Sequence, residues 1–116
     1  MELLKSMCAV HAPAGNEVEM KEFILNYLKS NESSFTVKPE VISGNEIQDC
    51  IILKFGKPRT AIFAHMDSIG FTVRYGKQLI KLGGPRTNEG TELIGTDSNG
   101  FIDTQLLVIE DDSGQT

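Results

Sequence analysis

The sequence predicts an α/β protein, and two observations carry that prediction. Apolar residues at helical spacing form one stripe through residues 17–30, and the short apolar run Ala61–Ala64 is typical of a strand buried on both faces. Strands buried in this way occur in parallel sheets that helices cover. The pattern therefore indicates the opening of a helix-covered α/β sheet in the first part of the chain.

The composition is that of a soluble globular protein. The 116 residues are 40% hydrophobic and 23% charged, and the net charge is −5, which argues against a nucleic-acid-binding surface. Apolar stretches are far shorter than the ~20 residues of a membrane span, and the N-terminus lacks a signal-peptide core, so we expect a cytoplasmic protein. Cys8 and Cys50 are too isolated for a zinc ribbon or a disulfide framework, and we expect them in helix core and strand.

Two helices are predicted near the N-terminus. Residues 2–10 carry apolar side chains at helical spacing, and Pro13 ends this first helix. A loop over residues 11–16 follows, in which Asn16 is placed as an N-cap with Glu19 three residues later, as in a capping box. The second helix is predicted over residues 17–30, because its apolar stripe is sustained over several turns.

About four strands are then predicted before residue 75. Residues 35–42 are typical of an edge strand, because Pro39 cannot donate to a sheet ladder. Residues 47–55 become continuously apolar, as an inner strand would. The third strand begins at Thr60 and leads into His65 and Asp67, after which Phe71, Val73 and Tyr75 resume a period-two alternation.

The pattern changes from Gly76 onward. Short strand candidates at residues 78–82, 91–95 and 101–109 are separated by glycine-rich and polar turns, and Asn99-Gly100 is a strong hairpin signal. Strands at this spacing indicate part of a β-barrel or sandwich. The sequence therefore predicts a domain boundary near Tyr75.

His65 and Asp67 are the candidate functional residues. Side chains two apart on a strand point the same way, and ligands of open α/β sheets gather beyond the C-terminal ends of the strands. Neutral imidazole is the commonest metal ligand, and a neighbouring carboxylate can fix its tautomer or handle protons. The alternative is a hydrogen-bonded pair in a solvated turn, since a lone His-x-Asp is a weak signal.

The segment Ala64–Phe71, Ala-His-Met-Asp-Ser-Ile-Gly-Phe, resembles the metal-site segment of the M42 family of metallo-aminopeptidases, the glutamyl and tetrahedral aminopeptidase group. Two further stretches agree in order and approximate spacing. His11–Glu17, His-Ala-Pro-Ala-Gly-Asn-Glu, is similar to a His-x-Pro-Ser-Gly-x-Glu pattern of that family, and Leu82-Gly83-Gly84 is similar to its Leu-Gly-Gly. The resemblance covers about the first seventy to ninety residues.

The resemblance implies a fold and a division of the chain. Residues 1–75 would be the N-terminal part of a three-layer α/β/α metallopeptidase catalytic domain. Residues 76–116 would begin an inserted β-barrel domain, which is incomplete here. Members of this family assemble into homo-oligomers, so the same is expected of this chain.

The resemblance also implies a reaction, hydrolysis of the amino-terminal residue of peptide substrates by two divalent metal ions, zinc or cobalt. His65 matches a metal-ligating histidine, and Asp67 matches the catalytic carboxylate that orients the site. A bridging Asp, a Glu general base, further carboxylate ligands and a second His cannot be assigned. We therefore expect the 116-residue chain to be inactive alone, and it need not bind metal on its own.

Several alternatives stay open. Ser68 departs from the family, which has Glu at that position, and it lacks the strand-turn-helix context of a serine hydrolase nucleophile. His11 is expected to be a structural hydrogen-bonding residue, and the acids Asp97, Asp103, Glu110, Asp111 and Asp112 to be solvated charges. The M18, M20 and M28 peptidase families also use His-x-Asp at a strand end. From a different class, the chain could be a non-catalytic α/β module that associates with itself or a partner.

Overall fold

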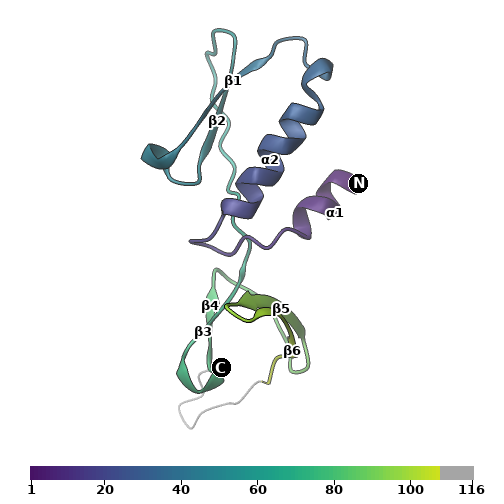
Figure 1. Ribbon diagram of the computed structural model, residues 1–116, viewed down its shortest axis with the longest axis vertical. Helices are drawn as coiled ribbons and strands as arrows, with labels where there is room; N and C mark the ends of the chain where they lie inside the picture. Colours follow the sequence, from purple (N-terminus) through teal and green to yellow (C-terminus); the bar gives the residue numbers. More distant parts are fainter. Residues whose placement is uncertain (108–116) are drawn as a thin grey trace. The chain divides into compact units, whose positions relative to one another are not determined.

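The computed structural model describes residues 1–107 and contains both helices and strands (Figure 1). Its contacts divide the chain into two compact units, with the division after Gly83. The elements are, in order, α1 (Glu2–Cys8), α2 (Val18–Ser30), η1 (Glu32–Ser34), β1 (Pro39–Ser43), η2 (Asn45–Ile47), β2 (Ile51–Phe55), β3 (Gly70–Val73), η3 (Tyr75–Lys77), β4 (Leu79–Leu82), β5 (Glu92–Asp97) and β6 (Gly100–Gln105).

Both predicted helices are confirmed, but the predicted cap of the second is wrong. Helix α2 begins at Val18, and the N-cap position falls on Glu17 instead of Asn16. The backbone N–H of Asn16 donates to the Pro13 carbonyl at 2.9 Å, so Asn16 belongs to the preceding turn. No side chain bonds to the first turn of α2 from the cap, and the capping box with Glu19 does not form.

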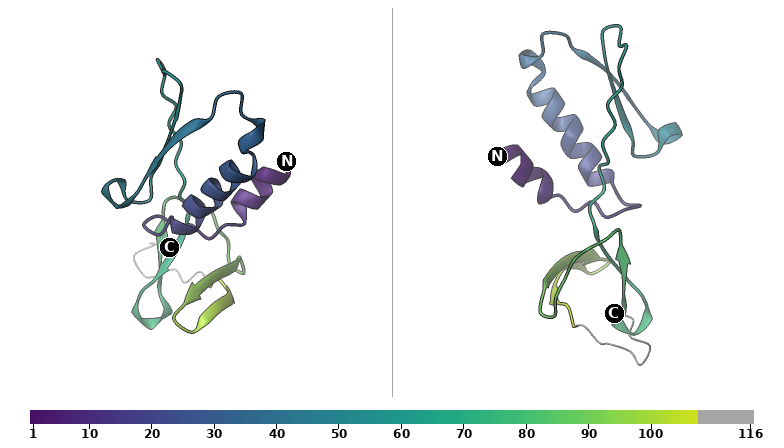
Figure 2. Two further views of the ribbon diagram at one scale, coloured as in Figure 1. Left: turned by 45° about the horizontal axis from the view of Figure 1, so that its top comes forward. Right: turned by 180° about the vertical axis from the view of Figure 1, so that it is seen from behind.

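Helix α2 lies beside the β1–β2 hairpin, as both views in Figure 2 show. Met20 is buried, whereas Val18 and Tyr27 of the predicted apolar stripe are 41% and 42% exposed. Lys21 Nζ reaches Asp49 Oδ1 at 2.7 Å, and both side chains are largely buried. This ion pair fixes the helix to the loop that precedes β2.

The first two strands are shorter than the sequence predicted. They form an antiparallel pair in register from Pro39 opposite Phe55 to Ser43 opposite Ile51. Strand β1 begins at Pro39 because proline is tolerated as a first strand residue, where no ladder donor is needed. Strand β2 begins only at Ile51, since η2 and Gln48, whose φ is 54°, interrupt the extended backbone.

The predicted central strand over residues 60–64 is wrong. This segment has no strand assignment, and Ile62 and Phe63 are 94% and 91% exposed instead of buried on both faces. A strand requires a hydrogen-bonded neighbour, and each sheet among residues 1–107 is a two-stranded antiparallel pair that leaves this segment out. The parallel, helix-covered sheet that the run indicated is therefore not present in the described part of the chain.

Two further hairpins follow. Strands β3 and β4 pair from Gly70 opposite Leu82 to Val73 opposite Leu79, so the boundary predicted near Tyr75 falls inside a hairpin. In the second unit β5 pairs with β6, and the turn between them is Ser98-Asn99, one residue before the predicted Asn99-Gly100, because Gly100 pairs with Asp97 as the first residue of β6. Strand β6 ends at Gln105, and residues 108 and 109 of the predicted strand lie outside the described residues.

The hydrophobic core of the described residues is small. Three apolar residues are buried, and they are Ala12, Met20 and Leu106. Cys8 and Cys50 are both exposed, so the expectation that Cys8 lies in a helix core is wrong. The described helices include none long and apolar enough to cross a membrane.

Candidate metal centre

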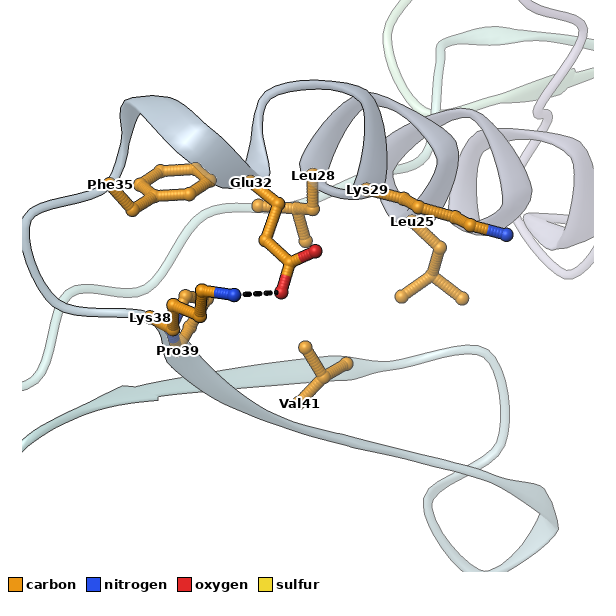
Figure 3. Close-up of a pocket in the computed structure, with 8 residues that line it drawn as sticks. All are labelled: Leu25, Leu28, Lys29, Glu32, Phe35, Lys38, Pro39 and Val41. Carbon is orange, nitrogen blue, oxygen red and sulfur yellow. Dashed lines mark hydrogen bonds and ion pairs between the residues drawn. The ribbon is translucent and has the colours of Figure 1, made fainter.

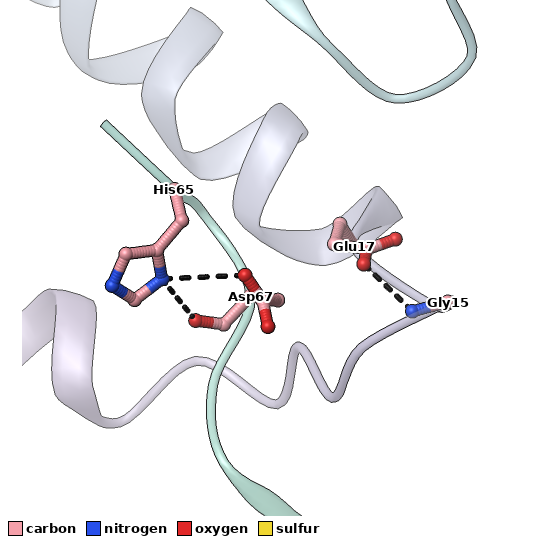
Figure 4. Close-up of polar contacts among 4 residues, drawn as sticks. All are labelled: Gly15, Glu17, His65 and Asp67. Atoms are coloured by element: carbon pink, nitrogen blue, oxygen red, sulfur yellow. Dashed lines mark hydrogen bonds and ion pairs between the residues drawn. The ribbon is translucent and has the colours of Figure 1, made fainter. Parts of the chain in front are cut away.

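His65 and Asp67 are adjacent and interact. His65 Nδ1 lies 3.0 Å from the backbone carbonyl oxygen of Asp67 and 3.2 Å from its carboxylate oxygen Oδ1 (Figure 4). Both neighbours are hydrogen-bond acceptors, so the proton of a neutral imidazole belongs on Nδ1. The lone pair is then on Nε2, which is the arrangement of a carboxylate–histidine–metal triad.

The two side chains differ in exposure. The His65 side chain is 85% exposed, whereas that of Asp67 is 39% exposed. The exposed ring can accept a ligand at Nε2 without a change in the surrounding backbone. Asp67 is placed to orient that ring through its contacts with Nδ1.

The pair is held at its C-terminal side by the loop that precedes α2. The Ser68 N–H donates to the Ala12 carbonyl at 2.7 Å, and Pro13 and Ser68 form an isolated parallel β-bridge. Ala12 is completely buried. Ser68 therefore contributes through its backbone, an interaction that does not depend on which side chain stands at this position.

The Leu82–Gly83 segment also contacts the residues that follow His65 and Asp67. Gly83 has a φ of +72°, and a Cβ added to it would lie 2.9 Å from Ile69 Cγ2. Leu82 pairs with Gly70 in the β3–β4 ladder. Residues 64–71 thus contact both the 11–17 stretch and the Leu82–Gly83 part of the third stretch within the first unit, although these segments are far apart in the sequence.

The residues present fit a metal ion in part. His65 Nε2 is one ligand, and catalytic zinc normally takes three protein ligands. Among residues 1–107, no group of three or more His, Cys, Asp or Glu side chains is placed to hold a metal ion. Asp97 accepts a hydrogen bond from the Asn99 N–H at 2.7 Å in the β5–β6 turn, and Asp103 is exposed, while Glu110, Asp111 and Asp112 lie outside the described residues.

Sequence reasoning missed two residues of this neighbourhood. The sequence predicts a loop at Ala12 and a helix residue at Glu17, whereas the Ala12 carbonyl accepts the Ser68 N–H and Glu17 Oε1 accepts the Gly15 N–H at 2.6 Å. The Pro13-Ala-Gly-Asn16 turn was the available signal, since a tight turn needs an acceptor for its inner amides. What the sequence could not indicate was that this turn faces Ser68.

A concave region lies between α2, η1 and β1, and none of its lining residues belongs to the His65–Asp67 pair (Figure 3). It is an open pocket of about 250 Å³ between the C-terminal half of α2, η1 and β1. Its lining is apolar except for Lys29 and the ion pair between Lys38 Nζ and Glu32 Oε1, which are 2.7 Å apart. Lys38 holds the pKa of the Glu32 carboxyl below its usual range, first by this hydrogen bond and second by its charge.

A scan against models of protein families found no match to this chain, and a search of curated proteins found none either. The family resemblance is therefore an expectation from the three motif stretches of the sequence alone.

Proposed function

We propose that this chain supplies the His65–Asp67 part of a two-metal aminopeptidase centre of the M42 type. The single observation that carries the proposal is the Ser68–Ala12 hydrogen bond, which joins the His11–Glu17 stretch to the His65–Asp67 stretch. Two motifs that were matched separately in the sequence would be expected to meet if both serve one site. Chance matches carry no such expectation.

In this proposal each residue has a distinct role. His65 binds a divalent metal, zinc or cobalt, through Nε2, and Asp67 accepts the Nδ1 proton and fixes the ring. The metal ions, when bound, supply a hydroxide at neutral pH and polarise the scissile carbonyl. The remaining ligands and the general base come from elsewhere, so we expect no hydrolysis of amino-acyl p-nitroanilides by these residues alone.

The finer architecture is part of the same proposal. Residues 1–75 would open a three-layer α/β/α catalytic domain, and residues 76–116 would open an inserted β-barrel. The support is the change in element type, because both α-helices precede Tyr75 and the described elements from Leu79 onward are strands. Peptide substrates, a homo-oligomeric state and a cytoplasmic location belong to the proposal through the family resemblance.

Cobalt titration tests the proposal directly. Co²⁺ is added to the chain and to the variants His65→Ala and His11→Ala, and the visible absorption of the bound ion is followed. We expect the affinity to fall at least about tenfold in His65→Ala, because a ligand is lost. His11→Ala is the matched control and should bind as the unaltered chain does. Equal binding by all three proteins would refute the proposal.

One observation favours an alternative, a non-catalytic module that associates with itself. The run Ala61–Ala64 is apolar and exposed along its whole length, which is typical of a surface that another chain covers. Sedimentation of the chain and of Phe63→Ser discriminates between the two. Self-association that Phe63→Ser abolishes, with metal binding indifferent to His65→Ala, would favour the module.

A further inference from the structure

Glu17 links the loop before α2 to the helix itself. Its backbone carbonyl accepts the Lys21 N–H at 3.0 Å, which is the first hydrogen bond of the helix and fixes the Glu17 backbone. Its carboxylate oxygen Oε1 accepts the Gly15 N–H at 2.6 Å (Figure 4). Hydrogen bonds from an amide to a carboxylate are short and roughly twice as strong as neutral ones. The side chain therefore fastens the loop to a rigid element.

The fastened loop is a tight turn. The Asn16 N–H donates to the Pro13 carbonyl at 2.9 Å, and Gly15 has a φ of +89°, a conformation that glycine adopts without strain. The Glu17 carboxylate is the acceptor for the Gly15 amide inside this turn. Without the carboxylate, that amide would turn to water and the turn would lose one of its two hydrogen bonds.

The N-terminal end of the turn, at Ala12, contacts the segment that carries the candidate metal centre. Ala12 is completely buried, and its carbonyl accepts the Ser68 N–H at 2.7 Å. Ser68 follows Asp67, whose carbonyl and carboxylate oxygens contact His65 Nδ1. A continuous series of hydrogen bonds and short backbone segments thus joins the Glu17 carboxylate to the His65 ring.

We propose that Glu17 is a positioning residue for the His65–Asp67 pair. By holding the turn it keeps the Ala12 carbonyl under the Ser68 amide, and so it sets the orientation of Asp67 and of the His65 ring. The importance of this orientation for chemistry rests on the proposed function. The coupling itself is a property of the chain without metal and can be measured there.

The experiment compares Glu17→Ala, Glu17→Gln and Glu19→Ala. Glutamine keeps an oxygen that can accept the Gly15 N–H, and Glu19 is the matched control because it is exposed on the same first turn of α2. Amide hydrogen exchange of Ser68 and the ¹⁵N shifts of the His65 ring at a fixed, mildly alkaline pH are measured without metal. Thermal unfolding of each variant is measured in parallel.

We expect Glu17→Ala to speed exchange of the Ser68 amide about tenfold and to reduce the share of the Nδ1-protonated tautomer of His65. Glu17→Gln should restore both readouts in large part, and Glu19→Ala should change neither. A uniform loss of stability would not alter the tautomer or be rescued by glutamine. If Glu17→Ala matches Glu19→Ala in both readouts, the proposal is wrong. If Glu17→Ala does not fold, Glu17→Gln is the test of the proposal. Loss of the Nδ1-protonated His65 tautomer in Glu17→Gln would then overturn the proposal.

Cobalt titration of the same variants separates this proposal from the proposed function. Suppose that Ser68 exchange and the His65 tautomer respond to Glu17→Ala but no cobalt binds through His65. The proposed metal site is then refuted, and the positioning role of Glu17 stands. If cobalt binds through His65 with equal affinity in the unaltered chain and in Glu17→Ala, the metal site stands and the positioning role of Glu17 is refuted. With both proposals correct, Glu17→Ala should weaken cobalt binding about threefold to tenfold.

Discussion

Two halves of one short segment behave differently in this protein. Residues 61–64 are apolar, yet Ile62 and Phe63 are 94% and 91% exposed and the run belongs to no sheet formed by residues 1–107. Residues 65–71 are more polar, yet Ser68 is bridged to Pro13 and Phe71 lies half-buried in β3. The less apolar half, residues 65–71, is the one that pairs with other segments of the chain.

The difference teaches that a partner, and not apolar content, makes a strand. Extended backbone must have its N–H and C=O groups satisfied, and neighbouring segments do this for Ser68 and for residues 70–73. Residues 61–64 have no such neighbour in the described part of the chain. Three sets of substitutions test this comparison and a fourth tests an ion pair elsewhere in the first unit, given from the largest expected effect to the smallest.

Ala12→Leu should disrupt the packing of residues 65–71 against the loop that precedes α2. Ala12 is completely buried where the loop meets Ser68, so three added carbon atoms must displace one of the two segments. We expect the free energy of unfolding to fall by about 2 kcal/mol in chemical denaturation. Ala14→Leu, at an exposed position of the same loop, is the control and should change it by less than about 0.5 kcal/mol. Equal effects would mean that the junction does not stabilise this unit.

Gly83→Ala should lower the free energy of unfolding by straining the backbone beside Ile69. Gly83 has a φ of +72°, where a side chain is strained, and the new Cβ would lie 2.9 Å from Ile69 Cγ2. Ile69 is 64% exposed and can move, so the backbone strain dominates and a loss of about 1 kcal/mol is expected. Gly84→Ala meets no atom within 4 Å and should be nearly neutral. A larger loss from Gly84→Ala would contradict this account.

Phe63→Ser should leave the stability of the chain almost unchanged. The Phe63 ring is 91% exposed, so its removal uncovers little and should alter the free energy of unfolding by less than about 0.5 kcal/mol. Phe71→Ser, within residues 65–71, should cost at least about 1 kcal/mol, because that ring is half-buried. The comparison fails if denaturation shows the two substitutions to be equally costly.

The smallest effect is expected at the exposed ion pair between Lys38 and Glu32. Lys38 lowers the pKa of Glu32 in the folded chain, so the pair stabilises the fold above the unfolded pKa, and this contribution is lost as the pH falls through the folded pKa. Lys38→Gln should raise the Glu32 pKa, as a carboxyl-detected NMR titration would show. Lys57→Gln, at an exposed position outside the described ion pairs, should leave that pKa unchanged. A Glu32 pKa that stays low in Lys38→Gln would disprove the assigned cause.

Local patterns could be predicted well from the sequence. Both helices lie where propensity and spacing placed them, and the β5–β6 turn is within one residue of its predicted position, whereas the predicted alternation fails at Tyr75, which lies in η3. The pairing of His65 with Asp67 was also predictable, because the two residues are only two apart. The cap of α2 was not, since the Asn16 amide is engaged by Pro13 and the helix starts one residue later.

The sequence by itself determined the local elements and the two side chains of the candidate site, because these depend on residues within a few positions of one another. Only the tertiary structure decided that Ala12 would lie against Ser68, that Glu17 would hold the turn between them and that Ala61–Ala64 would stay unpaired. These outcomes depend on which distant backbone groups meet. A hydrogen bond between segments more than fifty residues apart leaves no periodic signal in the sequence of either one.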